Sequence, residues 1–440
     1  MTAPIITIGL ALSGAAVLAN TDSGDKPVET AFAYQSSAYG TRVRAGDDSG
    51  SAGSGPTAWS ILGCTKLAPI SRHQNGFIGK VNANSMVDVG AVSSRAWTYR
   101  LPKKDTYGTR AVNTVADVVL GDPDGAHLSI GSMRSTADAF ARSSTLGSAT
   151  DIVWSDLDIK LAPGDEPATG TPLDQLVDAV NNDADAAALQ IIRETGGVDI
   201  TGVGRVSFGW TRTPVRKALG FARASVYGLR IKLENGSRVD LGRARARIQK
   251  DMPAGVLGGH AYGLEATAAD DAVRVGRVAK WILPCQGTDG EWKHNRLAGL
   301  HSPGAFAVEG VHSAVNGIQR ENHSAKATTF GEVASVDVGD GQLVITGARA
   351  QANVRQDENG RIDARNIKGT TTGSITAGGE TQHFPAGSDV ITIPGVAKIE
   401  RDIVTRGRRS IEVTALRVTL LDGSGLVLEL AHAKARIARH

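Results

Sequence analysis

The sequence predicts a mainly β protein made of two tandem homologous antiparallel β domains, each sandwich-like or an extended meander, with one helical insertion in the first domain. Three observations predict this fold class. Apolar and polar residues alternate over many short segments, Asn-Gly and Asp-Gly dipeptides separate such segments, and the two halves of the chain contain similar segments in the same order.

The composition is that of a globular protein. Hydrophobic residues make up 41% of the 440 residues and charged residues 21%, which excludes a disordered chain and a coiled coil. The 53 glycines and the small number of aromatic residues (Phe 8, Tyr 6, Trp 6) favour sheets packed through small side chains. The net charge is +3 with both signs interleaved, which argues against nucleic-acid or polybasic membrane partners.

Residues 1–30 are predicted to be a signal peptide or an N-terminal docking strand. Residues 4–20 are uncharged and largely apolar, like the hydrophobic region of a signal peptide, although Met1 to Ala3 lack a basic residue. The alternative is a strand that adds to a sheet of its own chain or of a neighbour, which would build a filament. Elsewhere the sequence has no apolar run long enough for a membrane span, so we expect no integral membrane span.

The two cysteines lie in similar segments, because residues 60–64 resemble residues 281–285. Further matches keep the same order along the chain: 38–40 with 261–263, 90–94 with 310–314, 124–125 with 340–341, and 228–248 with 415–437. We interpret them as a duplication, with a first domain at 31–250 and a second, homologous domain at 258–438. The connection is expected near residues 252–255.

Alternation of apolar and polar residues predicts half-buried strands. The clearest examples are residues 115–120, 128–130, 229–233, 335–338 and 411–418. The dipeptides between strands tolerate positive φ, which tight hairpin turns require. They occur at 124–125, 235–236, 340–341, 359–360 and 422–423, and they indicate antiparallel meanders.

One segment has the helical period instead. Thr171 is suited to the N-cap, Pro172 to the first helical position, and apolar residues follow at helical spacing as far as Ile192. Glycines at 196–197 are expected to stop the helix, and Asn181 and Asn182 mark a place where it can break. Since the second domain has no counterpart, residues 172–195 are predicted to be an insertion.

We find no short catalytic, nucleotide-binding or zinc motif in the sequence, so no catalytic, cofactor-binding or metal-binding residues are predicted. The nearest set of histidines is His294, His301, His312 and His323, whose spacing fits no zinc template and favours surface or turn positions. Acidic segments at 122–125, 337–341 and 357–360 could offer oxygen ligands to calcium, but turn formation is the favoured interpretation.

Arg243, Arg245 and Arg247 alternate along a predicted strand, which places three cations on one face. A solvated edge strand or a face paired with carboxylates is favoured over a site for an anionic polymer.

Cys64 and Cys285 form a candidate disulfide, since two cysteines in an exported chain commonly pair. Equivalent positions of two repeats meet only across a pseudo-twofold axis. A Cys64–Cys285 bridge and two separate thiols, buried or available for intermolecular pairing, are therefore both open, and separate thiols are slightly favoured. The nearby Trp59 and Trp281 are predicted to anchor the core.

Residues 38–43, 54–58 with 62–64, 90–92, and 413–418 with 431–433 resemble the choice-of-anchor P family of actinobacterial exported proteins. The resemblance covers most of residues 31–438. It implies an exported or surface protein whose shared motifs are structural, with no catalytic residues to carry over. The family is named for C-terminal anchors, and this sequence ends without one, so the resemblance favours a released protein or one held by protein contacts.

The leading hypothesis is a non-enzymatic, secreted structural or surface-interaction protein that can self-assemble through its N-terminal strand. Its expected partners are other proteins or copies of itself, as a homo-oligomer or filament, with no nucleic acid and no cofactor. The alternative is an extracellular carrier of lipids or small apolar ligands, because long strands and one amphipathic helix can enclose an apolar cavity. A hydrolase with non-sequential catalytic groups is the least favoured hypothesis.

Overall fold

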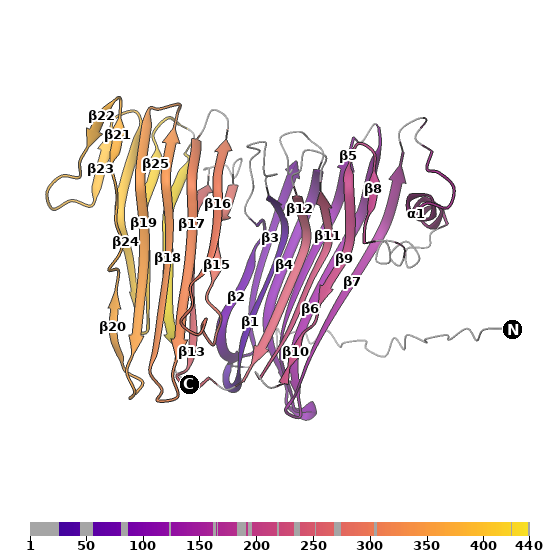
Figure 1. Ribbon diagram of the computed structural model, residues 1–440, viewed down its shortest axis with the longest axis horizontal. Helices are drawn as coiled ribbons and strands as arrows, with labels where there is room; N and C mark the ends of the chain where they lie inside the picture. The colour runs from indigo at the N-terminus through magenta and orange to yellow at the C-terminus, as the bar shows by residue number, and fades with distance from the viewer. Residues whose placement is uncertain are drawn as a thin grey trace.

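The computed structural model describes residues 26–44, 56–80, 87–122, 125–161, 164, 166–182, 191, 196–217, 220–232, 238–250, 252–267, 274–302, 306–423 and 425–438. Over these residues the chain forms four antiparallel sheets and one α-helix. The predicted fold class, mainly β with antiparallel sheets and a single helix, is confirmed. Two bodies of strands lie side by side along the longest axis, with the strands running across that axis (Figure 1).

The first half of the chain contributes two sheets. Sheet A has the order β2-β1-β12-β11-β9-β8 with β10 beside β11: β1 (Val28–Arg44), β2 (Ser60–Ala68), β8 (Val198–Ile200), β9 (Gly204–Arg212), β10 (Val215–Arg216), β11 (Phe221–Lys232) and β12 (Arg238–Gln249). Sheet B is a meander: β3 (Ile70–Lys80), β4 (Val87–Leu101), β5 (Thr106–Gly121), β6 (His127–Arg142) and β7 (Thr145–Lys160).

The second half contributes two more sheets. Sheet C has the order β14-β13-β26-β25-β24-β23 with β15 beside β13: β13 (Val256–Thr267), β14 (Arg274–Val278), β15 (Trp281–Ile282), β23 (Val390–Ile393), β24 (Ala397–Gly407), β25 (Ser410–Leu420) and β26 (Val427–Ala438). Sheet D has the order β16-β17-β18-β19-β21-β22 with β20 beside β19: β16 (Lys293–Ser302), β17 (Phe306–Gln319), β18 (Ala325–Val338), β19 (Leu343–Gln356), β20 (Ile362–Asn366), β21 (Ile375–Ala377) and β22 (Glu380–Gln382).

Sheets A and C have corresponding strand orders, in which the first long strand of each half lies beside the last strand of that half. The correspondence extends to a backbone irregularity, because Gly242 in β12 and Ala431 in β26 both have positive φ (62° and 55°) at positions that the sequence matches align. These features support the predicted duplication, which stays a prediction. Strand β1 begins at Val28 and β13 at Val256, a few residues before the predicted domain starts.

Each half has its own hydrophobic core between its two sheets. A glycine allows the two sheets of each half to approach closely. A Cβ atom on Gly40 would lie 2.1 Å from Val92 Cγ1, and one on Gly263 would lie 2.2 Å from Val311 Cγ1. The same glycine-to-valine contact therefore joins sheet A to sheet B and sheet C to sheet D.

The predicted turn chemistry holds where the structure describes it. Asp340 and Gly341 both have positive φ (51° and 91°) between β18 and β19, and Gly360 and Gly423 have positive φ in the predicted turns after β19 and β25. The turn at 235–236 and Asp124 lie outside the described residues.

The helix α1 (Pro172–Asn181) begins as predicted. Thr171 accepts a hydrogen bond from the backbone N–H of Asp174 at the N-cap, and Pro172 occupies the first turn. Leu176, Ala179 and Val180 are buried and join the core of the first half. The helix ends at Asn181, where the sequence indicated a break, and most of the predicted remainder to residue 195 lies outside the described residues.

The predicted signal peptide or docking strand at residues 4–20 also lies outside the described residues. Among the residues that the structure describes, no helix has the length and apolar character needed to cross a membrane.

Candidate functional site

A disulfide joins the two halves of the chain. Cys64 in β2 and Cys285, which follows β15, form a bond with an S–S distance of 2.07 Å and a Cα–Cα distance of 5.2 Å. Each cysteine is only 1% exposed. Of the two alternatives that the sequence left open, the structure has the bridge.

Near this disulfide, one arginine of each half donates a hydrogen bond to the other half. The Arg436 guanidinium of the second half donates a hydrogen bond to the backbone carbonyl of Cys64. The Arg247 guanidinium of the first half donates to the Gln286 side chain, next to Cys285. Arg247 and Arg436 occupy positions that the sequence matches align, but one donates to a side chain and the other to a backbone carbonyl. The twofold relationship of the two halves stays a prediction.

The two tryptophans near the cysteines differ in their surroundings. Trp281 packs against the core of the second half, as predicted. Trp59 instead lies at the junction, where the Lys280 ammonium is 3.9 Å from the centroid of its ring and Tyr39 contacts it edge-on. Trp59 thus contacts the other half of the chain, and its role as a core anchor stays a prediction.

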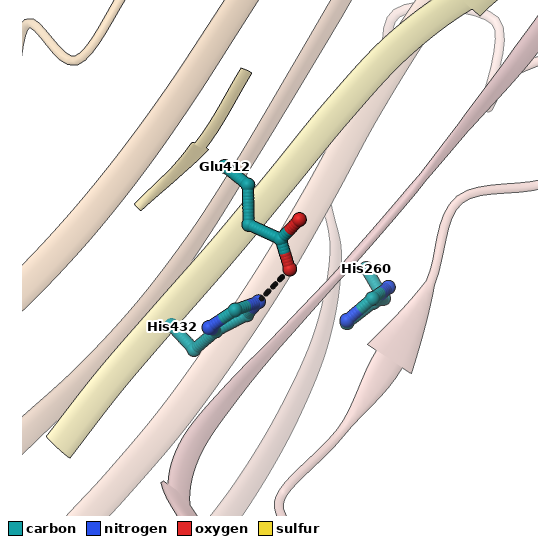
Figure 2. A group of neighbouring side chains, drawn as sticks. All are labelled: His260, Glu412 and His432. Carbon is teal, nitrogen blue, oxygen red and sulfur yellow. Dashed lines mark ion pairs between the residues drawn. The ribbon is translucent and has the colours of Figure 1, made fainter. Parts of the chain in front are cut away.

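Three side chains that could ligate a metal meet on one face of sheet C (Figure 2). His260 comes from β13, Glu412 from β25 and His432 from β26, and these three strands are neighbours in the sheet. In the strand register, His260 of β13 and Glu412 of β25 both pair with Lys434 of β26. His432 lies two residues before Lys434 on the same strand. The potential ligand atoms all lie within 4.8 Å of one another.

His432 connects two partners on β25. Its Nδ1 is 3.0 Å from Thr414 Oγ1, and its Nε2 is 3.2 Å from Glu412 Oε1 (Figure 2). The other Glu412 oxygen is 2.6 Å from Lys434 Nζ. Hydrogen bonding to His432 and then to Lys434 outweighs partial burial and lowers the pKa of Glu412 to about 2.

His260 has a different environment, although its ring lies nearly parallel to that of His432, with ring centroids 5.4 Å apart. Its Nε2 atom is buried and has no hydrogen-bond partner. Burial, followed by the positive charge of Lys280, lowers the pKa of His260 well below its ordinary value. His260 is therefore neutral at neutral pH.

Two histidines and a carboxylate are a ligand set that suits zinc or iron. The surrounding charges do not suit a divalent cation. Lys434 already holds one Glu412 oxygen, and the cations that lower the pKa of His260 include Lys280 and Arg277 as well. A metal ion would have to displace Lys434 and remain beside the other two cations. We therefore interpret this group as a hydrogen-bonded polar cluster of the sheet.

The order Thr414, His432 and Glu412 resembles a nucleophile, a base and an orienting acid. Thr414 is only 5% exposed and stands within a central strand. A substrate could not reach its hydroxyl without opening the sheet, so the arrangement can fix side chains but is poorly placed for nucleophilic attack. The cluster leaves no local spacing in the sequence, because its members lie on strands far apart in the chain.

Of the four histidines nearest in sequence, two contact each other and a third lies elsewhere. His294 Nδ1 lies 3.0 Å from His312 Nε2 on sheet D, whereas His323 contacts the backbone carbonyl of Pro253 in a turn. The side chain of His301 lies outside the described part of the chain.

Two of the acidic turn segments use their carboxylates for turn formation, as the favoured interpretation predicted. Asp337 Oδ1 accepts from the Gly341 N–H at 2.6 Å, and Asp357 Oδ1 accepts from the Arg361 N–H at 2.8 Å.

The alternating arginines occupy a different setting from the one expected. Strand β12 lies between β1 and β11, so the expectation of an edge strand is wrong. Their cross-strand neighbours are not carboxylates either. Tyr39 and Tyr227 flank Arg243, Ser37 and Ser225 flank Arg245, and Gln35 and Arg223 flank Arg247. We call Arg223, Arg243, Arg245 and Arg247 the arginine row.

A cleft of about 670 Å³ lies at one end of sheet D. Its lining includes Arg320, Lys326, Arg355, Asp357 and Asp363. These charged side chains do not favour an apolar ligand.

Comparisons with known proteins do not identify this chain. No family model matches it, and no curated protein matches it. Among solved structures, the crystal structure of the P. putida toluene transporter TodX aligns with 93% of this chain and 90% of that chain, at 8% sequence identity and a TM-score of 0.09. The resemblance to the choice-of-anchor P family stays a prediction.

Proposed function

We propose that the protein is an exported, non-enzymatic structural or surface-interaction protein in which a disulfide holds two β bodies as one unit. The observation that carries this proposal is the Cys64–Cys285 bond, which is buried and joins residues 221 positions apart. Disulfides of this kind persist in oxidising compartments. A protein that works outside the cell gains resistance to unfolding from such a bond, since it restricts a long segment of the unfolded chain.

The polar cluster on sheet C supports a non-enzymatic role, because its hydroxyl is buried within a central strand. The charged lining of the cleft on sheet D does not favour the alternative of a lipid carrier. Self-assembly through residues 4–20 belongs to the same proposal. Size-exclusion chromatography with light scattering should show oligomers of the chain that retains these residues and monomers of a variant without residues 1–20.

The proposal is tested by locating the native protein and trapping its thiols. Cells of the source organism are fractionated in the presence of an alkylating reagent, and the chain is analysed by mass spectrometry. We expect it in the medium or the cell envelope, with Cys64 and Cys285 alkylated only after reduction in denaturant. A cytosolic chain whose two cysteines are alkylated without reduction contradicts export. Stoichiometric lipid in an organic extract of the purified protein favours the carrier instead.

A further inference from the structure

The arginine row concentrates positive charge on one face of sheet A. Arg223 is directly opposite Arg247 in the β11–β12 pair, a position that brings Cα atoms to about 4.5–5.5 Å. Arg243, Arg245 and Arg247 follow at every second position of β12, about 6.6 Å apart along the strand. Like charges on directly opposed residues destabilise a sheet. The row therefore has an electrostatic cost that an anion would remove.

The residues around Arg245 do not neutralise it. Burial, and then the charges of Arg243, Arg223 and Arg247, lower the pKa of Arg245 to about 9. On the neighbouring strand Ser225 faces Arg245, and beyond it Arg212 faces Ser225. The Nε–H groups of the other three members of the row are buried and have no acceptor in the protein.

At the aligned positions of sheet C, a carboxylate neutralises the cation. There Lys434 aligns with Arg245 and Glu412 aligns with Ser225, and the two side chains form an ion pair of 2.6 Å. The first half thus has a serine where the second half has the carboxylate. An external anion would supply the missing negative charge.

Aromatic rings hold the guanidinium planes of the row. Arg243 lies over Tyr39 and Tyr227, with its Cζ 5.4 and 5.2 Å from the ring centroids, and Arg247 lies 4.7 Å over Phe221. Stacking fixes a guanidinium by its face and leaves its N–H edge for bidentate hydrogen bonds to an oxyanion. In Arg247, which is only 7% exposed, Nη2 already donates to Gln249 and Gln286, so the N–H groups without an acceptor begin at its Nε. The same stacking covers the rings, so they offer no free platform for nucleic-acid bases.

We propose that the arginine row binds an extended anionic polymer carrying phosphate or sulfate groups and no bases. Tetrahedral oxyanions match the paired N–H edges, and a chain with repeated charges would contact several members of the row together. This site goes beyond the proposed function and would exist whether or not the protein is exported.

The test measures binding to the full-length chain by isothermal titration calorimetry at low and physiological salt. The probes are inorganic polyphosphate, dextran sulfate, uncharged dextran and a 20-nucleotide single-stranded DNA. Two variants address the row. Ser225→Glu introduces the carboxylate that the second half has, and Arg245→Gln removes the central cation. Thr392→Glu, at an exposed position of β23, adds the same charge elsewhere and serves as the control.

We expect wild type to bind polyphosphate or dextran sulfate with an affinity that falls as salt rises, and not to bind dextran. Either row variant should lower the association constant at least about tenfold, whereas Thr392→Glu should change it less than about twofold. Ser225→Glu should also melt at a higher temperature than wild type. Tighter binding of polyphosphate would assign phosphate as the recognised group, and tighter binding of dextran sulfate would assign sulfate.

Three results would overturn the proposal: no binding of either polymer by wild type, unchanged binding by both folded row variants, or Arg245-dependent binding of the DNA that is tighter than that of both polymers. If Ser225→Glu does not fold, Arg245→Gln decides alone.

Discussion

Lys280 of the second half contacts Trp59 of the first half, with its Nζ 3.9 Å from the centroid of the indole ring. These two residues are separated by the same number of positions as Cys64 and Cys285. Two pairs of aligned positions therefore meet at the junction. Cys64 and Cys285 are joined by the disulfide, and Trp59 and Lys280 by a cation–π contact. Lys280 Nζ is buried and has no hydrogen-bond partner, so the contact with Trp59 is formed at a desolvation cost.

The variant Lys280→Met should raise the free energy of unfolding by about 1 kcal/mol at neutral pH. A cation–π contact contributes about 0.5–2 kcal/mol, whereas desolvating an unpaired ammonium costs several kcal/mol. Burial, and then Arg277, lower the pKa of Lys280 well below its ordinary value. The unfolded chain thus binds a proton that the folded protein binds poorly, and stability falls as pH decreases from above 10 towards neutrality.

Urea unfolding at pH 7 and pH 9.5 measures this effect. Lys280→Met should reduce the stability difference between the two pH values. Lys326→Met, at an exposed position of β18, serves as the control and should behave as wild type. A clear loss of stability in Lys280→Met would mean that the contact with Trp59 outweighs desolvation.

Gly263→Ala should destabilise the protein by about 1–3 kcal/mol, because the new methyl group would overlap Val311 Cγ1 at 2.2 Å and approach Glu332 O at 2.9 Å. Gly40→Ala should have a similar effect through Val92. Thermal unfolding of both variants is compared with Gly63→Ala, whose added Cβ has no atom within 4 Å. Adding Val311→Ala to Gly263→Ala should recover part of the loss. A neutral Gly263→Ala would show that the two sheets can separate easily.

The sequence predicted the strands, several turns and the helix start because each depends on neighbouring residues. Alternation marked β25, Asp340-Gly341 marked a turn, and Thr171-Pro172 marked the N-terminus of α1. The polar cluster could not be predicted in the same way, since His260 and His432 become neighbours only when the first and last strands of the second half pair. The arginine row was visible as an alternation, but its central position in the sheet depends on the same long-range pairing.

Leu176→Ala should cost about 2–5 kcal/mol, because Leu176 is fully buried and its truncation leaves a cavity between α1 and the core of the first half. Asp178→Ala, on the exposed side of the same helix, should change stability little. Chemical denaturation monitored by tryptophan fluorescence measures both. An unchanged midpoint for Leu176→Ala would show that the helix is peripheral to the folded unit.

Protonation of Glu412 at low pH should lower the free energy of unfolding. Its pKa is lowered to about 2 in the folded protein, first by hydrogen bonding to His432, while the unfolded chain has an ordinary glutamate pKa near 4.5. A lowered carboxyl pKa contributes stability that is complete above the unfolded value and is lost as pH falls towards the folded value. The contribution amounts to at most about 3 kcal/mol, at 1.36 kcal/mol for each pKa unit.

We expect the loss of unfolding free energy between pH 6 and pH 3 to be smaller in Glu412→Gln than in wild type. Glu309→Gln, at an exposed position of β17, should lose as much as wild type. Equal losses in wild type and Glu412→Gln would mean that the contacts of Glu412 with His432 and Lys434 contribute nothing to stability.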